Sequence, residues 1–192
     1  MSGAQVDGIR VGPGITGDSA DDLLRVAELV RSVPDYPQPG VLFRDITPVL
    51  AHGESFATVT TELAANAGEA DLVIGVEARG FLLGAAVALV AGVGTVPVRK
   101  AGKLPAVAAS RSYDLEYGSA TLELPAGVVE PGTRVYVVDD VLATGGTARA
   151  TAELVQACGA VVVGVAVLMD LAFLPWRAAL GDVEVTSLLT VE

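Results

Sequence analysis

The chain has 192 residues, which is enough for one domain with a sizeable hydrophobic core. Hydrophobic residues make up 52% of it, and this share favours an α/β domain with a buried parallel sheet over a disordered or fibrous protein. The formal net charge of −11 argues against a general nucleic-acid binder, which needs a basic face to neutralise phosphates.

The first half of the chain contains helices separated by glycine- and proline-rich segments. Residues 1–18 are rich in glycine without a usable periodicity, and we expect them to form a flexible extension before a single domain over residues 19–192. The apolar spacing predicts helices over residues 20–33 and 54–67. Between these helices, residues 34–47 hold three prolines and are expected to form a loop.

From residue 72 onward, strands and helices alternate. The strands are expected at residues 72–76, 95–98, 135–138, 161–168 and 183–189, and the helices at residues 80–91, 147–157 and 173–180. This order predicts an open, doubly wound, mainly parallel α/β sheet flanked by helices, with ligands at the carboxyl ends of the strands. A long loop at residues 99–112 and a hairpin of residues 113–117 and 120–124 interrupt the alternation.

The cellular setting follows from cysteine usage and hydropathy. The single cysteine, Cys158, cannot form an internal disulfide, and the N-terminal residues lack the pattern of a secretory signal, so we expect a cytoplasmic protein. Residues 80–98 are uncharged over about the length of a membrane span. Glycines and a proline interrupt this stretch, so we interpret it as a buried helix and a strand and expect no membrane association.

Residues 135–147 carry the strongest functional signal. An apolar strand ends in two adjacent carboxylates, Asp139 and Asp140, which would repel one another unless a ligand binds them. A small turn then opens directly into a helix, and its backbone amides are suited to hold a phosphate; it consists of Ala143, Thr144, Gly145, Gly146 and Thr147. A phosphate beside two carboxylates indicates a sugar phosphate. The alternatives are a P-loop, which lacks its lysine here, and an ordinary helix cap.

Residues 137–147 (VVDDVLATGGT) resemble the phosphoribosyl pyrophosphate (PRPP) signature of type I phosphoribosyltransferases. Four further segments, in this order, are similar to the adenine-specific branch of that family: PGVLFRDIT (39–47), EARGF (77–81), VPVRKAGKLP (96–105) and YDLEYG (113–118). The resemblance runs from about residue 34 to the C-terminus. It implies transfer of the phosphoribosyl group of PRPP to adenine, giving AMP and pyrophosphate.

The resemblance also implies how PRPP is held. Asp139 and Asp140 would bind the ribose hydroxyls, the turn at residues 143–147 would bind the 5′-phosphate, and the catalytic Arg79 would contact pyrophosphate. Magnesium would be carried by PRPP, with no protein ligand assigned. A cationic cluster before the long loop would serve partly in the neighbouring subunit's site, which implies a homodimer. The cluster consists of Arg99, Lys100 and Lys103.

The base would be bound by a small N-terminal hood at about residues 34–47 and covered by a lid at about residues 99–118. In the hood, Leu42, Phe43 and Arg44 would bind adenine, with the Phe43 ring stacked on the base and main-chain groups at its edge. Glu116 would act on the purine ring as the catalytic acid–base group. The lid sequence at residues 106–111 is less polar than is usual in the family.

Two other functions remain open from the sequence. A phosphoribosyltransferase for another base, such as xanthine, hypoxanthine, guanine or a pyrimidine, would share the PRPP half of the site. A PRPP-sensing regulator would need a nucleic-acid-binding surface, for which neither the charge nor the N-terminus provides a basis.

Overall fold

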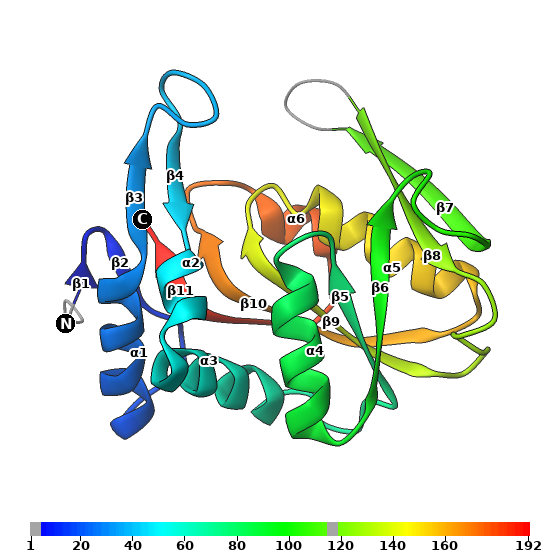
Figure 1. Ribbon diagram of the computed structural model, residues 1–192, viewed down its shortest axis with the longest axis horizontal. Helices are drawn as coiled ribbons and strands as arrows, with labels where there is room; N and C mark the ends of the chain where they lie inside the picture. Colours follow the sequence, from blue (N-terminus) through cyan, green and yellow to red (C-terminus); the bar gives the residue numbers. More distant parts are fainter. Residues whose placement is uncertain (1–4, 115–118) are drawn as a thin grey trace.

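The computed structural model describes residues 5–114 and 119–192. Across this part of the chain, nine strands form the main sheet in the order β1-β2-β11-β10-β9-β5-β6-β8-β7, and β3 and β4 form a separate hairpin (Figure 1). The strands are β1 Gln5–Val6, β2 Ile9–Val11, β3 Arg31–Pro34, β4 Leu42–Asp45, β5 Leu72–Val76, β6 Gly94–Lys100, β7 Val107–Asp114, β8 Ser119–Pro125, β9 Arg134–Leu142, β10 Val161–Leu171 and β11 Val185–Val191. The helices are α1 Asp18–Leu29, α2 Thr47–Ala51, α3 Gly53–Ala65, α4 Gly80–Ala91, α5 Gly146–Ala157 and α6 Trp176–Leu180.

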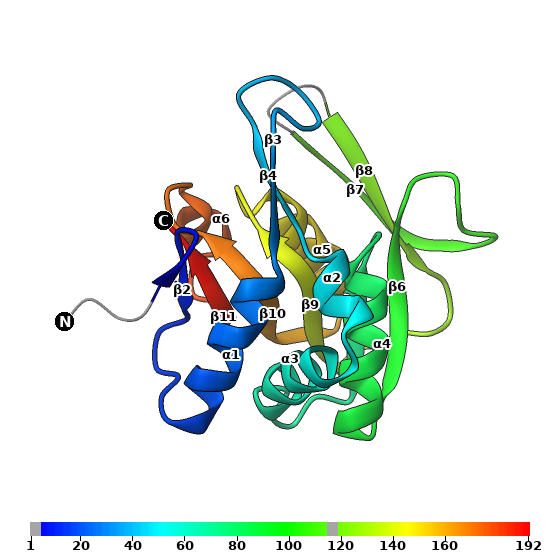
Figure 2. The same cartoon turned by 60° about the vertical axis from the view of Figure 1, so that its left-hand side comes forward.

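The five central strands are parallel, and helices cover both faces of the sheet. Helices α1, α3 and α4 cover one face of the sheet, and α5 and α6 cover the other (Figure 2). Side chains alternate along β9: Tyr136 and Val138 belong to the apolar cluster on the first face, whereas Val135 and Val137 belong to the cluster on the second. Burial on both faces explains why β9 has an apolar run and not an alternating pattern. The predicted doubly wound α/β sheet is confirmed.

Close backbone contacts between α4 and its neighbouring strands locate the start of this helix. A β-carbon on Gly75 would lie 2.6 Å from the carbonyl oxygen of Gly80, and one on Gly84 would lie 2.9 Å from the Cα of Gly75. A β-carbon on Gly80 itself would lie 2.9 Å from Oδ1 of Asp139. Glycine at these positions therefore lets the first turn of α4 rest directly on β5 and on the end of β9.

Two expectations for the N-terminal part need correction. Residues 5–11, predicted as part of a flexible extension, form β1 and β2, and β2 pairs with the edge strand β11. The expected helix over residues 20–33 ends at Leu29, and β3 and β4 form a hairpin where a loop was expected at residues 34–47. Strand β2 is stabilised by a partner distant in sequence, which local periodicity does not reveal. Strands β3 and β4 are each only four residues long and pair with each other, so neither gives a clear periodic pattern.

The segment expected to be a long loop at residues 99–112 is also largely extended. Strand β6 continues to Lys100, and β7 begins at Val107 and pairs with β8. The inner face of this hairpin packs on α5, with Tyr113 and Leu122 buried. The hairpin is thus confirmed in a longer form, while the end of its predicted first strand and the turn at Gly118 lie outside the described residues.

The apolar stretch at residues 80–98 is confirmed as a helix followed by a strand, α4 and β6, but the expectation that the helix is buried holds for one face only, because Leu82 and Leu89 are exposed. Within the two described segments, every helix is too short or too polar to cross a membrane.

Candidate active site

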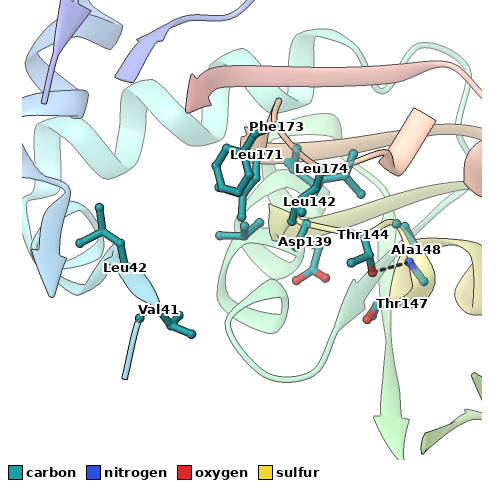
Figure 3. Close-up of a pocket in the computed structure, with 16 residues that line it drawn as sticks. Val41, Leu42, Asp139, Leu142, Thr144, Thr147, Ala148, Leu171, Phe173 and Leu174 are labelled. Carbon is teal, nitrogen blue, oxygen red and sulfur yellow. Dashed lines mark hydrogen bonds between the residues drawn. The ribbon is translucent and has the colours of Figure 1, made fainter. Parts of the chain in front are cut away.

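A cavity of about 820 Å³ lies where the carboxyl ends of β9 and β10 face the β3–β4 hairpin (Figure 3). Asp139 and the turn after β9 form its polar end, and apolar side chains of Leu42 and Phe173 approach it from opposite sides. A sheet of this topology is expected to bind ligands at this edge. The cavity therefore coincides with the site that the sequence predicts.

The turn after β9 is shaped by Gly145, whose φ is +80°. A β-carbon there would lie 2.9 Å from the carbonyl oxygen of Trp176, so α6 closes the turn from behind. Helix α5 begins at Gly146, and the amide of this residue donates a long hydrogen bond of 3.5 Å to Oγ1 of Thr144 (Figure 3). Helix-start amides and two threonine hydroxyls, those of Thr144 and Thr147, thus border the cavity, which suits an anion.

Asp139 and Asp140 occupy the end of β9, as predicted, but they differ in environment. Oδ1 of Asp139 accepts a hydrogen bond of 2.8 Å from the amide of Asp140. Burial, followed by the neighbouring charge of Asp140, raises the pKa of Asp139 well above the usual value for aspartate. A ligand that donates hydrogen bonds to this pair would favour its charged form.

Arg79 lies between Asp140 and the β3–β4 hairpin and contacts both. Its Nη2 atom lies 2.6 Å from Oδ2 of Asp140, yet that buried oxygen lacks a well-directed hydrogen bond from any described residue. The same guanidinium lies 5.1 Å from the ring centroid of Phe43. Arg79 is therefore placed beside the carboxylate pair, and Asp140 retains capacity to bind a hydroxyl group.

The cationic cluster predicted from the sequence is organised by an acid that the prediction left out, Glu77. Nζ of Lys103 hydrogen-bonds to Glu77, Nε of Arg99 lies 3.5 Å from it, and the amide of Lys100 donates to it at 2.9 Å. Burial raises the pKa of Glu77, but the bonds from Lys103 and the Lys100 amide, together with the two cationic charges, bring it below the usual value. The EARGF motif contains this residue and was a usable signal.

The three predicted base-binding residues have different surroundings. Leu42 lines the cavity, whereas the Phe43 ring faces Arg79 and Tyr36 in an adjoining hollow of about 430 Å³. The side chain of Arg44 is buried and bonds to Asp7 outside the cavity. The structure thus brings Leu42 to the cavity and leaves the Arg44 side chain elsewhere. Glu116 lies outside the described residues.

An apolar wall opposite Leu42 was absent from the sequence prediction. It follows the carboxyl end of β10 and consists of Leu171, Phe173 and Leu174. Phe173 is exposed over 64% of its surface although it is aromatic, which identifies it as the accessible part of this wall. The rule that ligands bind beyond strand ends applies to β10 as well as β9, and it is the signal that could have located the wall.

Between the described residues of the β7–β8 hairpin and the cavity lining there is one side-chain hydrogen bond. Oγ1 of Thr147 donates to the hydroxyl of Tyr113 at 3.1 Å, and Arg111 forms an ion pair with Glu153 of α5. These contacts fasten the base of the hairpin to the helix that begins at the phosphate-binding turn.

Comparison with known proteins agrees with this geometry. Residues 49–172 match the phosphoribosyl transferase domain family. The fold, with a carboxylate pair before a glycine turn, defines the same class. The chain belongs to the phosphoribosyltransferases, in the branch formed by adenine phosphoribosyltransferases.

The relatives are similar over nearly their whole length. An adenine phosphoribosyltransferase of Nocardioides sp. is 56% identical, covering 92% of this chain and 99% of the relative. The crystal structure of the Rhodothermus marinus enzyme has a TM-score of 0.85 and 44% identity, covering 90% of this chain and 99% of its own. The Saccharomyces cerevisiae enzyme, crystallised with an imino-altritol bisphosphate and adenine, has a TM-score of 0.83 and 36% identity, covering 88% and 99%.

The raised pKa of Asp139 predicts a pH-dependent cost to stability. The folded protein holds this proton more tightly than the unfolded chain, so its contribution is complete below the ordinary value of 3.8 and is lost as pH rises towards the folded pKa. Asparagine does not titrate. We therefore expect Asp139→Asn to melt at a higher temperature than wild type, by a margin that grows as the pH rises above 3.8 towards the folded pKa of Asp139.

Differential scanning calorimetry across this range measures the margin. Asp182→Asn, at an exposed position in the turn after α6, removes one negative charge from the same acidic chain and serves as the control. A margin for Asp139→Asn that is constant with pH, or equal to that of the control, would show that Asp139 is not held in its proton-binding form.

Proposed function

We propose that this protein transfers the 5-phosphoribosyl group of PRPP to adenine, giving AMP and pyrophosphate. The observation that carries the proposal is one cavity with two chemical ends. Its polar end has Asp139 and the turn at residues 143–147, and its apolar end has Leu42 and Phe173. A sugar phosphate suits the first end and a flat purine the second.

PRPP is proposed to bind with its 5′-phosphate on the amides and hydroxyls of Ala143, Thr144, Gly145, Gly146 and Thr147. The ribose hydroxyls then donate to Asp139 and Asp140, where Asp140 retains accepting capacity. Arg79 is in position to meet the pyrophosphate once PRPP competes for Asp140. Cationic groups that oppose the charge of a leaving pyrophosphate lower the barrier to its departure.

Magnesium is proposed to enter with PRPP. Within the described residues, no group of three or more acidic, histidine or cysteine side chains is arranged to hold a metal ion. The Asp139–Asp140 pair fits the way Mg²⁺ is usually bound, through one or two carboxylates together with substrate phosphates and water. When bound, the ion would neutralise charge on the pyrophosphate.

The base is proposed to lie between Leu42 and the apolar wall, with its edge towards β4. In the described structure β4 pairs only with β3, so the main-chain groups of its other edge are available to a base. Stacking of Phe43 on the base then requires its ring to leave Arg79 and Tyr36.

Glu116 is proposed to share the proton of the purine ring, which makes the attacking nitrogen richer in electrons. The sugar becomes cation-like as pyrophosphate leaves, as in glycoside hydrolysis. Closure of the β7–β8 hairpin would exclude water from this intermediate.

Adenine is expected to be the preferred base, because the relatives of this chain and the segment at residues 39–47 indicate it. An assay with PRPP and magnesium should yield AMP from adenine and at least a hundredfold lower kcat/KM with hypoxanthine, about 2.7 kcal/mol of discrimination. Comparable turnover of both purines would remove the adenine assignment and leave phosphoribosyl transfer intact. Binding of PRPP without transfer to any base would instead indicate a PRPP sensor.

The double variant Asp139→Asn/Asp140→Asn should bind PRPP at least tenfold more weakly, because hydrogen bonds to charged acceptors are stronger than those to neutral ones. Calorimetric titration with PRPP and magnesium measures this. The control is Asp71→Asn with Glu69→Gln. It removes two exposed carboxylates that pair with Arg134, at the amino-terminal end of β9 and away from the cavity. Equal PRPP affinity in the folded double variant and the control would contradict the role of the pair.

We also propose that the protein is a cytoplasmic homodimer. The single, half-buried Cys158 fits a reducing compartment. Helix α4 exposes an apolar stripe in which Leu82 and Leu89 have 56% and 82% of their surface accessible, next to a hollow lined by Phe81 and Pro97. Arg99 lines the same hollow, so a second copy seated there would lie beside the cationic cluster.

Light scattering should give about twice the chain mass of 19.5 kDa. Leu89→Asp should shift the protein towards monomer, because it buries a charge in an apolar interface. Val128→Asp introduces the same charge at an exposed apolar residue outside α4 and should leave the mass unchanged. A wild-type monomer at micromolar concentration would contradict the dimer.

A further inference from the structure

The β3–β4 hairpin, referred to below as the hood, projects away from the main sheet beside the cavity (Figures 1 and 2). Among the described strands, β3 and β4 form backbone ladder hydrogen bonds only with each other. A two-stranded hairpin has little stability of its own, so its position depends on side-chain contacts with the rest of the molecule.

Arg44 makes the best-defined of these contacts. Its residue exposure is 8%, unusually low for arginine. Nη1 donates to Oδ2 of Asp7 at 2.8 Å and also to the hydroxyl of Ser32, while Nη2 donates to the carbonyl oxygen of Asp7 at 3.0 Å. The hydroxyl of Ser32 donates in turn to Asp7, so one carboxylate binds both strands of the hood.

Asp7 itself is held by the main sheet. It lies in the turn between β1 and β2 with φ of +48°, and β2 is hydrogen-bonded to β11. Behind the turn, the amide of Glu192 donates to the carbonyl oxygen of Gly8 at 3.1 Å. Asp7 is therefore linked through β2 and β11 to the main sheet, which also carries the turn at residues 143–147.

Arg44 is two residues from Leu42 on β4, and Leu42 lines the cavity. Side chains two apart on a strand share one face and move together with the strand. A shift of Arg44 would therefore displace Leu42 relative to the turn at residues 143–147. The contact sets the width of the cavity between its base and PRPP ends.

We propose that Asp7 is a positioning residue, which acts through Arg44 to hold the hood at the distance at which adenine meets PRPP. This inference rests on the proposed binding of the base beneath the hood. Asp7 and Arg44 both lie outside the residues that match the family domain, 49–172.

A purely structural role explains the contact less well. The Asp7 side chain is 63% exposed, and ion pairs with an exposed partner contribute little to overall stability. A buried arginine is also a costly way to fasten two strands, since apolar side chains of similar size stabilise as well. What the arginine adds is a fixed geometry, because its fork holds a carboxylate and a carbonyl at once. The hydrogen bond from Ser32, then those from Arg44, lower the pKa of Asp7 and keep it ionised at neutral pH.

The test is Asp7→Ala, with Arg10→Gln as the matched control. Both changes fall in the same N-terminal hairpin and remove one ion pair, but Arg10 contacts Glu192 and not the hood. We expect Asp7→Ala to raise the KM for adenine about tenfold, the effect of losing one charged hydrogen bond, while the Kd for PRPP stays near wild type. The Tm should fall, because Arg44 remains buried without its carboxylate partner. Arg10→Gln should change none of these.

Asp7→Asn separates geometry from charge, because its side-chain oxygen accepts the same hydrogen bonds. It should recover part of the adenine KM. Hydrogen exchange of residues 31–45 gives a measurement independent of turnover, and should be faster in Asp7→Ala than in Arg10→Gln.

An unchanged adenine KM with unchanged exchange in Asp7→Ala would overturn the proposal. The proposal would also be overturned if the affinity for PRPP fell by the same factor as the adenine KM rises, since that pattern indicates a role in the fold alone. If wild type fails to use adenine, the proposed function fails first, and the exchange experiment still decides whether Asp7 holds the hood.

Discussion

The proximity of two carboxylates at the buried end of β9 is the constraint on which the site depends. Asp139 lies against the first turn of α4, where only glycine fits at position 80, and Asp140 lies against Arg79 from the same turn. Burial, followed by the repulsion between the two acids, raises the pKa of Asp139, and the charge of Arg79 opposes this rise. Two adjacent acids at this position lower the free energy of unfolding. A ligand whose hydroxyl groups donate hydrogen bonds to them would recover part of that free energy on binding.

The parts around this centre are each joined to it by few polar contacts. Arg79 contacts Phe43 of the hood, Thr147 bonds to Tyr113 of the β7–β8 hairpin, and Arg44 reaches the N-terminal turn. The central strands, by contrast, share large buried clusters on both faces. The buried clusters therefore fix the position of the turn at residues 143–147, whereas in the described part of the chain the hood and the β7–β8 hairpin are joined to the site by individual polar contacts.

The sequence was most informative where burial and local chemistry agree. Strand β5 and helix α4 have the predicted bounds, because apolar runs between glycines mark them. Strand β2 was missed because its partner β11 is far away in sequence. The hood is a local hairpin, and it was missed because the prolines and the glycine between its strands were interpreted as a loop. The same limit applies to Glu77: its motif was visible, but only the fold brings Arg99 and Lys103 around it.

The two buried acids near the site show how one fold prepares opposite charge states. Glu77 is surrounded by cations, and its pKa falls below the usual value despite burial. Asp139 is beside another acid, and its pKa rises. In a chain of net charge −11, this division matters for a polyanionic substrate, because cations must be ordered near the cavity without attracting the remaining acids into it. Glu77 orders two of them from within the sheet, and Asp140 orders Arg79. The carboxylates therefore hold positive charge near the cavity, where the proposed reaction releases pyrophosphate, and in the same proposal Asp139 and Asp140 also bind the sugar.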